Sequence, residues 1–334
     1  MTVEPMTRAY PRNLPRYLWL LVRLVFVVAI LLVIATRLDL QSLIAQAKLL
    51  DYRYIFLGLV LWMIALVVVS FRWKILIDVI TPGTSLISLL VFNFVGIFYS
   101  QFLPGSVTGD IVKGFYLART QAAKVGIISS VLIDRFIGIG VNGLIGLIAL
   151  MSNDVILRAL NVSRTTAALL IVVIAFGIVI GYIAFRVIGR WESQFPRFVI
   201  PIYTSIKLYL QEPAALIKAS LSSLVFFLVW SMALLCLAFA AGLNTLDFPT
   251  ILLILAAVNL AQFIPISVNG WGVREGALIV LLSAYNVQPE KSLLLSLLTV
   301  IPGLIVAILG GIVVLTDYHY NMHGISSLSE GPLS

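Results

Sequence analysis

The sequence predicts an all-α polytopic membrane protein with about six full transmembrane helices and two oppositely oriented re-entrant helical hairpins. The 334 residues are 61% hydrophobic and only 11% charged, whereas soluble proteins carry about 25% charged residues. Mean hydropathy is +1.10. No ten-residue segments of alternating apolar and polar residues, which mark a transmembrane β-barrel, are present. We therefore expect residues 1–334 to form a single integral membrane domain.

The apolar runs define the expected helices. Most of them approach the roughly 20 residues that a helix needs to cross the hydrocarbon layer. Three are unusual, because two end at Pro104 and Pro265 and a third has only about thirteen residues. The runs cover residues 17–36, 54–71, 86–103, 126–151, 166–185, 218–241, 248–264, 273–285 and 293–316. The segment 198–217 is predicted to be an amphipathic helix on the cytoplasmic surface, or a loop with no special role.

A polar, helix-breaking stretch occurs twice in the chain. QFLPGSVTGDIVK occupies residues 101–113, and QFIPISVNGWGVR follows 161 positions later at residues 262–274, with seven of thirteen residues identical. Backbone that is broken at membrane depth is stable only where protein or a water-filled cavity satisfies its polar groups. The repeat predicts a re-entrant hairpin in each of two repeat-like halves, approximately 54–151 and 218–316. The alternative is chance similarity between two proline-broken helix ends.

The distribution of Lys and Arg supports the hairpins. With a cytoplasmic N-terminus and two hairpins, thirteen basic residues, Arg72 among them, fall on the cytoplasmic side and six on the outer side. If the run 86–103 crossed fully, the basic segment 186–217 would face outside, against the positive-inside rule. The two breaks then enter from opposite sides and meet near the midplane, as in many secondary transporters with inverted repeats. Topology also accounts for the net charge of +8 without a nucleic-acid partner.

Ionisable residues follow each break, and they define the expected site. A charge at the centre of a bilayer costs at least about 2.5–3.5 kcal/mol, so such residues pair, line water or bind a charged substrate. Asp110 and Lys113 share one helix face, whereas the adjacent Arg274 and Glu275 are expected to find other partners. The cross-pairs Asp110–Arg274 and Lys113–Glu275 are one prediction. The alternative is a set of internal salt bridges that only lock the hairpins.

The favoured interpretation gives the basic residues the role of holding an anionic head group, with the acids tuning them. Arginine suits phosphate because its planar fork binds two oxygens at once. Neutral donors at the breaks and the two repeated glutamines complete the set. The candidate substrate-binding residues are Lys113, Arg274, Arg135, Asp110, Glu275, Asp134, Gln101, Gln262, Ser106, Ser267 and Asn269. No metal site is expected from the single Cys236 and two tail histidines, no cofactor is expected, and no nucleotide-binding loop is present.

These motifs resemble a known family. FLPGSVTGDIVKGFYLART, SSVLIDRFIGI and FIPISVNGWGVREGALIVLL are similar to the flippase-like transmembrane domain of lysylphosphatidylglycerol synthetases over roughly residues 15–320. Asp110, Asp134 and Lys113 stand where the family more often has Glu, Glu and Arg, and Ile266 replaces a frequent glycine. The soluble aminoacyl-transferase domain of the full-length synthetases is not in this sequence.

The resemblance implies translocation of a lipid between leaflets, either an aminoacyl-phospholipid or an isoprenoid-type lipid. We therefore expect a multi-pass protein of the cell (cytoplasmic) membrane that handles a phospholipid or polyprenyl-phosphate lipid and is not an enzyme. Two alternatives stay open. One is a membrane enzyme acting on a polyprenyl-phosphate, with Asp110 or Glu275 as base or metal ligand. The other is an accessory subunit that partners a lipid-modifying enzyme.

Overall fold

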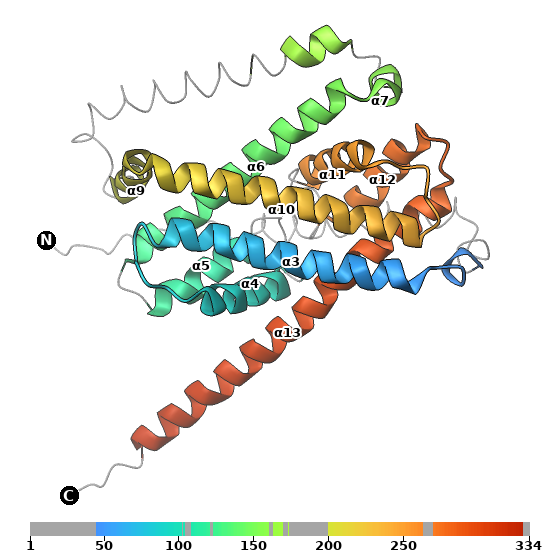
Figure 1. Ribbon diagram of the computed structural model, residues 1–334. Coiled ribbons are helices and arrows are strands. Elements are labelled where there is room, and N and C mark those ends of the chain that lie inside the picture. The colour runs from blue at the N-terminus through green and yellow to red at the C-terminus, as the bar shows by residue number, and fades with distance from the viewer. Residues whose placement is uncertain are drawn as a thin grey trace, which may run out of the picture.

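The protein is all-α in the part of the chain that the structure describes. The computed structural model describes residues 45–101, 103, 108–120, 123–159, 163–169, 173, 200–262 and 270–329. Every regular element in these ranges is a helix (Figure 1). Four helices among them are long and apolar enough to cross a membrane: α3, α6, α10 and residues 289–316 of α13. The prediction of an all-α polytopic membrane protein is confirmed, whereas the predicted total of six crossings stays a prediction.

Two long antiparallel helices, α3 (Tyr52–Ile77) and α10 (Pro213–Ala240), pack along each other (Figure 1). The Asp51 side chain caps the start of α3 by accepting a hydrogen bond from the Arg53 amide, and proline stands at the first turn of α10, where its missing N–H costs nothing. The Asp51 amide donates to the Ala240 carbonyl, which joins the start of α3 to the end of α10. This pair forms the wall on which the site is built.

Each repeated break lies between two short helices that pack together. The first pair is α4 (Leu86–Ser100) with α5 (Thr108–Thr120), and the second is α11 (Phe248–Gln262) with α12 (Val273–Ser283). At 1.5 Å per residue, a 15-residue helix is only about 22 Å long, less than the roughly 30 Å hydrocarbon layer. Both pairs therefore have the dimensions of re-entrant hairpins, and their direction of entry stays a prediction.

The first hairpin is closed by direct backbone contact between two glycines. A Cβ atom added to Gly96 of α4 would lie 2.7 Å from the carbonyl oxygen of Gly109 in α5, a distance that real side chains do not reach. Lys113 lies one turn further along α5 and contacts Asn93, one turn earlier in α4. These contacts show that α4 and α5 run antiparallel, and they bring Lys113 and Asn93 together.

The two remaining long helices cross over between the hairpins. Helix α6 (Lys124–Met151) follows the first hairpin but packs against α11 of the second, where Gly146 faces Ala256. Helix α13 (Pro289–Ser329) follows the second hairpin but packs against α4 of the first, where Gly310 lies against the Phe94 backbone. Each hairpin is thus held by the long helix that belongs to the other.

The helix order repeats with the same spacing as the sequence motif. Shifting α3 by 161 positions gives 213–238, and α10 spans Pro213–Ala240; shifting α4 gives 247–261, and α11 spans Phe248–Gln262. The same shift takes α5 to 269–281 and α6 to 285–312, which overlap α12 and α13. The chain therefore contains two runs of four helices in the same order, joined by a segment that includes α7 (Asp154–Ala159) and α9 (Ile200–Gln211).

Two apolar clusters fix these runs. The larger one packs α10, α11, α12 and α13 together around fully buried residues such as Ile254, Leu282 and Leu295. The smaller one joins α3 to α4, α5 and α6 through Trp73 and Leu117 among others. Burial of each such side chain contributes about 1.5–3 kcal/mol in water, and in a membrane close packing takes over this role. Trp73 of the smaller cluster contacts Lys113, one of the charged residues described next.

The observed helices agree with the predicted apolar runs wherever those runs fall in the described residues. The run 17–36 and most of 166–185 lie outside them. The predicted surface segment 198–217 contains the 12-residue helix α9, which ends at Gln211 before α10 begins at Pro213. Helix α13 extends well beyond the predicted limit of 316, to Ser329.

Candidate functional site

A cavity of about 320 Å³ lies on the side of the α3–α10 pair that faces α4, α5, α6 and α11. Helices α3, α4, α5, α6, α10 and α11 all contribute to its wall. The ring of Phe226 and the side chains of Phe227 and Trp230 form an apolar part. The polar part comprises Arg72, Asn93, Asp110, Lys113, Asp134, Arg135, Asn142, Ser223, Asn259 and Gln262. We call this space the central cavity.

The buried carboxylate of Asp134 is bound by Arg72 at two points. The Arg72 Nε donates to Oδ1 at 2.6 Å, and Nη2 donates to Oδ2 at 2.8 Å. The remaining Nη1 donates to the Ser223 hydroxyl on α10 at 3.0 Å. Both side chains are under 10% exposed, and such a two-point pair combines strong attraction with fixed geometry. It ties α3, α6 and α10 together at the cavity wall.

Lys113 is the most enclosed cation of the cavity, at 3% exposure. Its ammonium donates to the Asn93 side-chain oxygen at 3.1 Å and lies 3.0 Å from Asp110 and 3.9 Å from Asp134. It also lies 4.8 Å from the centre of the Trp73 ring, close enough for a cation–π interaction. The predicted shared face of Asp110 and Lys113 is therefore confirmed.

Asp110 also binds Arg135, whose Nη2 lies 2.6 Å from Oδ2. The five ionisable residues thus form one connected group in which Asp110 bridges Lys113 and Arg135, and Asp134 bridges Arg72 and Lys113. Among the described residues that line the cavity, three cationic side chains face two carboxylates, which gives a net charge of +1. A net positive charge in a partly apolar environment is costly, so this arrangement favours a ligand with a negative charge.

The second hairpin holds a separate ionic cluster, which does not line the central cavity. The Arg274 Nη2 donates to Glu275 Oε1 at 2.6 Å, and its Nε donates to the Ser296 hydroxyl at 3.1 Å. The other Glu275 oxygen accepts from the amide of Gly272 at 2.6 Å. Gly272 caps α12 with φ of +81°, a conformation that glycine adopts readily.

The prediction that Arg274 and Glu275 point to different partners is therefore wrong, and so are the cross-pairs Asp110–Arg274 and Lys113–Glu275. Glu275 is the third residue of α12, so its carboxylate turns back to the helix start in a capping arrangement. The long Arg274 side chain reaches the same place. This cluster has equal numbers of positive and negative charges, so it needs no further counter-ion.

Of the predicted neutral polar residues, the structure places one at the central cavity. Gln262 and its neighbour Asn259 line the central cavity, and Asn259 donates to Asn142 of α6 at 3.2 Å. Gln101 follows the end of α4 and is not among the residues that line the cavity. Ser106, Ser267 and Asn269 lie outside the described residues.

Arg72 was predicted to follow the apolar run 54–71 on the cytoplasmic side, but it lies within a helix and is buried. It is 6% exposed and lies inside α3. The signal that locates it is the continuing apolar sequence, since Trp73 and then Ile75, Leu76 and Ile77 follow it before the helix ends. Gly138 makes room for its guanidinium, because a Cβ there would lie 3.1 Å from Nη1.

The described residues contain no group of three His, Cys, Asp or Glu side chains that could hold a metal ion. The described side chains that line the central cavity include fixed cations, carboxylates and amides.

Comparison with known proteins identifies one family. Residues 20–311 match a family model described as the lysylphosphatidylglycerol synthase TM region. This range includes both hairpins, the central cavity and the Arg274–Glu275 cluster. No curated protein matches the chain significantly.

Proposed function

Because the chain belongs to the lysylphosphatidylglycerol synthase transmembrane-region family, we propose that it translocates a lipid with an anionic head group across the cell membrane. The central cavity binds the head group, and the acyl or prenyl chains stay in the bilayer. The family and the apolar helices make the chain a multi-pass membrane protein related to lipid modification or translocation.

The observation that carries the proposal is the net positive charge of the described residues around Lys113. Arg72, Lys113 and Arg135 face two carboxylates around one cavity. A phosphodiester carries one negative charge, which neutralises the set. Asn93, Asn259 and Gln262 contribute amide groups at the same wall, and these can donate to phosphate or glycerol oxygens.

The position of the cavity also supports translocation. Asp134 and Arg135 lie near the middle of the 28-residue α6, and Phe226 and Phe227 lie at the middle of the 28-residue α10. Both helices are long and apolar enough to span the bilayer, so we expect a site near their middle to lie away from both membrane surfaces. Binding near the midplane between repeat units is the usual plan of secondary transporters.

The size of the cavity limits what it takes up. About 320 Å³ is at the lower end of the range for small-molecule sites, so it accommodates a polar head group and not two acyl chains. A lipid that uses this site therefore keeps its chains in the membrane while the head group moves.

The test is a translocation assay with purified protein in liposomes. Phosphatidylglycerol carrying a fluorophore on its acyl chain is placed in both leaflets, and a membrane-impermeant reductant removes the outer signal. We expect the protein to make the inner pool accessible to the reductant. Lys113→Met should slow this by at least about tenfold, because a hydrogen bond to a charged group contributes about 1.5–3 kcal/mol.

Arg164→Gln is the matched control, since Arg164 pairs with Asp154 on the exposed surface far from the cavity. Equal rates for the wild type and Lys113→Met would contradict the proposal. The same samples distinguish the alternatives. An enzyme would change the lipid's mass when given a donor substrate, and an accessory subunit would show no translocation until a partner protein is added.

A further inference from the structure

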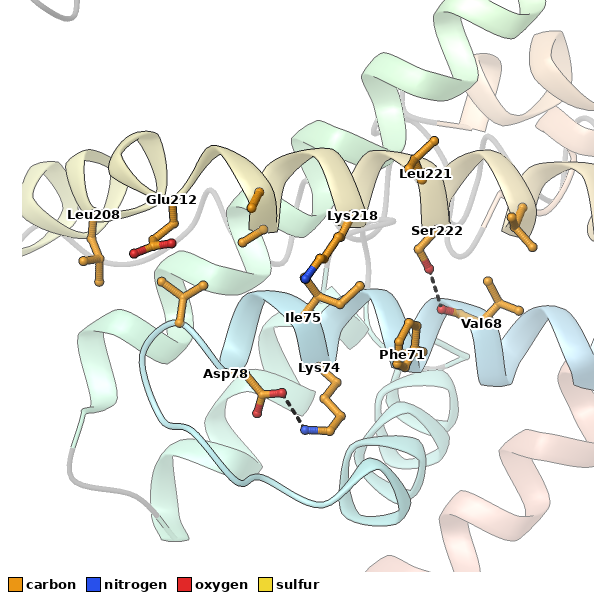
Figure 2. A pocket seen from close by; sticks show the side chains of 14 residues that line it. Val68, Phe71, Lys74, Ile75, Asp78, Leu208, Glu212, Lys218, Leu221 and Ser222 are labelled. Carbon is orange, nitrogen blue, oxygen red and sulfur yellow. Dashed lines mark hydrogen bonds and ion pairs between the residues drawn. The ribbon is translucent and has the colours of Figure 1, made fainter.

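A second and larger cavity, of about 1000 Å³, lies on the side of the α3–α10 pair away from the central cavity (Figure 2). Residues of α3, α9 and α10 line it, including Val68, Phe71, Lys74, Glu212, Lys218 and Val225. We call this space the α3–α10 groove. It shares no lining residue with the central cavity, because α3 and α10 stand between the two.

The groove has a charged end and an apolar end. Its charged residues lie near the last turn of α3 and the first turns of α10. Close to them, the Tyr209 hydroxyl donates to the Leu76 carbonyl and joins α9 to the end of α3. Val225 lies seven residues beyond Lys218 on α10, which is about 10 Å at 1.5 Å per residue. Phe71 and Val68 extend the apolar wall in the same direction along α3 (Figure 2). A phospholipid in one leaflet has this same polarity, with its head group at the helix ends and its chains toward the middle.

The groove contains equal numbers of positive and negative side chains, and this balance favours some phospholipid head groups over others. Lys74 and Asp78 form an ion pair one turn apart. Within the described residues, neither Glu212 nor Lys218 has an ion-pair partner. Two lysines and two carboxylates give a net charge of zero, so an anionic head group would face two carboxylates as well as two cations. A head group that carries both a phosphate and an ammonium matches both signs.

The Asp78 carboxylate lines the groove, is 36% exposed and has one oxygen without a donor in the described part of the chain. The Asp78 Oδ2 accepts from Lys74, but Asp78 Oδ1 is buried and no group in the described residues donates to it. Leaving a buried carboxylate oxygen without a donor costs free energy. A primary ammonium donates hydrogen bonds, whereas the quaternary ammonium of choline has no N–H.

We propose that the α3–α10 groove is a binding site for a phospholipid of the phosphatidylethanolamine type. The phosphate binds Lys218, the ammonium binds the Asp78 and Glu212 carboxylates, and one acyl chain lies along Phe71, Val68 and Val225. This site is separate from the head-group site of the central cavity. The inference does not depend on translocation, and a binding measurement tests it without reference to transport.

The experiment titrates the purified full-length chain in detergent with phosphatidylethanolamine, phosphatidylcholine or phosphatidylglycerol of identical acyl chains, and counts bound lipids by native mass spectrometry. We expect phosphatidylethanolamine to bind about tenfold more tightly than either of the others, which corresponds to one charge-assisted hydrogen bond. Equal affinity for phosphatidylethanolamine and phosphatidylcholine, or a preference for phosphatidylglycerol, would overturn the assignment.

Variants divide the groove into its parts. Asp78→Asn should remove the preference for phosphatidylethanolamine over phosphatidylcholine and leave phosphatidylcholine binding unchanged. Lys218→Gln should weaken phosphatidylethanolamine and phosphatidylcholine equally, because both carry the phosphate. Val225→Trp should weaken every lipid by filling the apolar end, and Val225 is 48% exposed, so the larger side chain does not disturb the core. Lys207→Gln on α9, which does not line the groove, is the control, and a loss with this variant equal to that with Lys218→Gln would also refute the site.

Discussion

Arg72 of α3 and Asp134 of α6 form a two-point ion pair at the wall of the central cavity, with Nε–Oδ1 and Nη2–Oδ2 distances of 2.6 and 2.8 Å. Lys113 lies 3.9 Å from the same carboxylate. Asp134 is therefore the shared counter-ion of two buried cations that come from different helices. The structural stability of the cavity and its capacity to bind an anion both depend on this one carboxylate.

Asp134→Asn should destabilise the protein by about 3–5 kcal/mol, because it leaves two buried cations with one carboxylate fewer. The single buried thiol, Cys236, allows a direct measurement, since a dye that fluoresces on reacting with thiols reports unfolding during heating. The double variant Arg72→Leu/Asp134→Leu should recover most of the lost stability, because it removes both members of the pair. If the double variant melts no higher than Asp134→Asn, the unpaired Arg72 is not the cause of the lost stability.

Gly96→Ala should force α4 and α5 apart, because its Cβ would lie 2.7 Å from the Gly109 carbonyl oxygen. Overpacking of this kind lowers the free energy of unfolding by about 1–3 kcal/mol. Because Lys113 would be displaced, the variant should also translocate lipid more slowly. Gly140→Ala in α6 is the matched control, since nothing lies within 4 Å of a Cβ at that position. Alanine there should leave the melting temperature unchanged or raise it slightly. Similar melting curves for the two variants would argue against close contact in the hairpin.

The double variant Arg274→Gln/Glu275→Gln should lower stability but keep the lipid preference of translocation. The two side chains neutralise each other and do not line the central cavity, so a bound head group does not meet them. Liposome assays with phosphatidylglycerol and phosphatidylcholine, normalised to folded protein, measure the preference. A selective loss of phosphatidylglycerol transport would place Arg274 in the head-group site after all.

Tyr209→Phe should reduce stability by about 1 kcal/mol, the usual contribution of one hydrogen bond. The Tyr209 hydroxyl donates to the Leu76 carbonyl at 2.9 Å and joins α9 to the end of α3. Burial raises the pKa of this hydroxyl, so it remains protonated and able to donate. The thiol-dye melting assay measures the difference, and an unchanged melting temperature would show that this contact contributes little.

The sequence was sufficient for the helices and for part of the site. Apolar runs located α3, α4, α6, α10, α11 and α12 because burial in lipid needs apolar residues over a fixed length. The spacing of Asp110 and Lys113 predicted their contact, since residues three apart share a helix face. These inferences depend only on local geometry, which one sequence contains.

The remaining features depend on which helices meet, and a single sequence does not contain that information. The pairing of Arg72 with Asp134 joins residues 62 positions apart, and no local pattern marks it. The prediction that Arg274 and Glu275 have separate partners was wrong for a different reason. A helical wheel separates neighbours, but at the first turn of α12 the Glu275 side chain folds back toward Gly272, where a long arginine also reaches.

The two helix runs match in order and spacing, but their charges do not. The positions 161 residues after Arg72, Asp134 and Arg135 hold Ala233, Leu295 and Ser296. Lys113 corresponds to Arg274, which is already neutralised by Glu275. Under the proposed function, the described charged residues that a phosphate meets in the central cavity all come from the first run of four helices. The free-energy profile of a head group is therefore expected to differ between inward and outward movement, although the two helix runs around it have the same order and spacing.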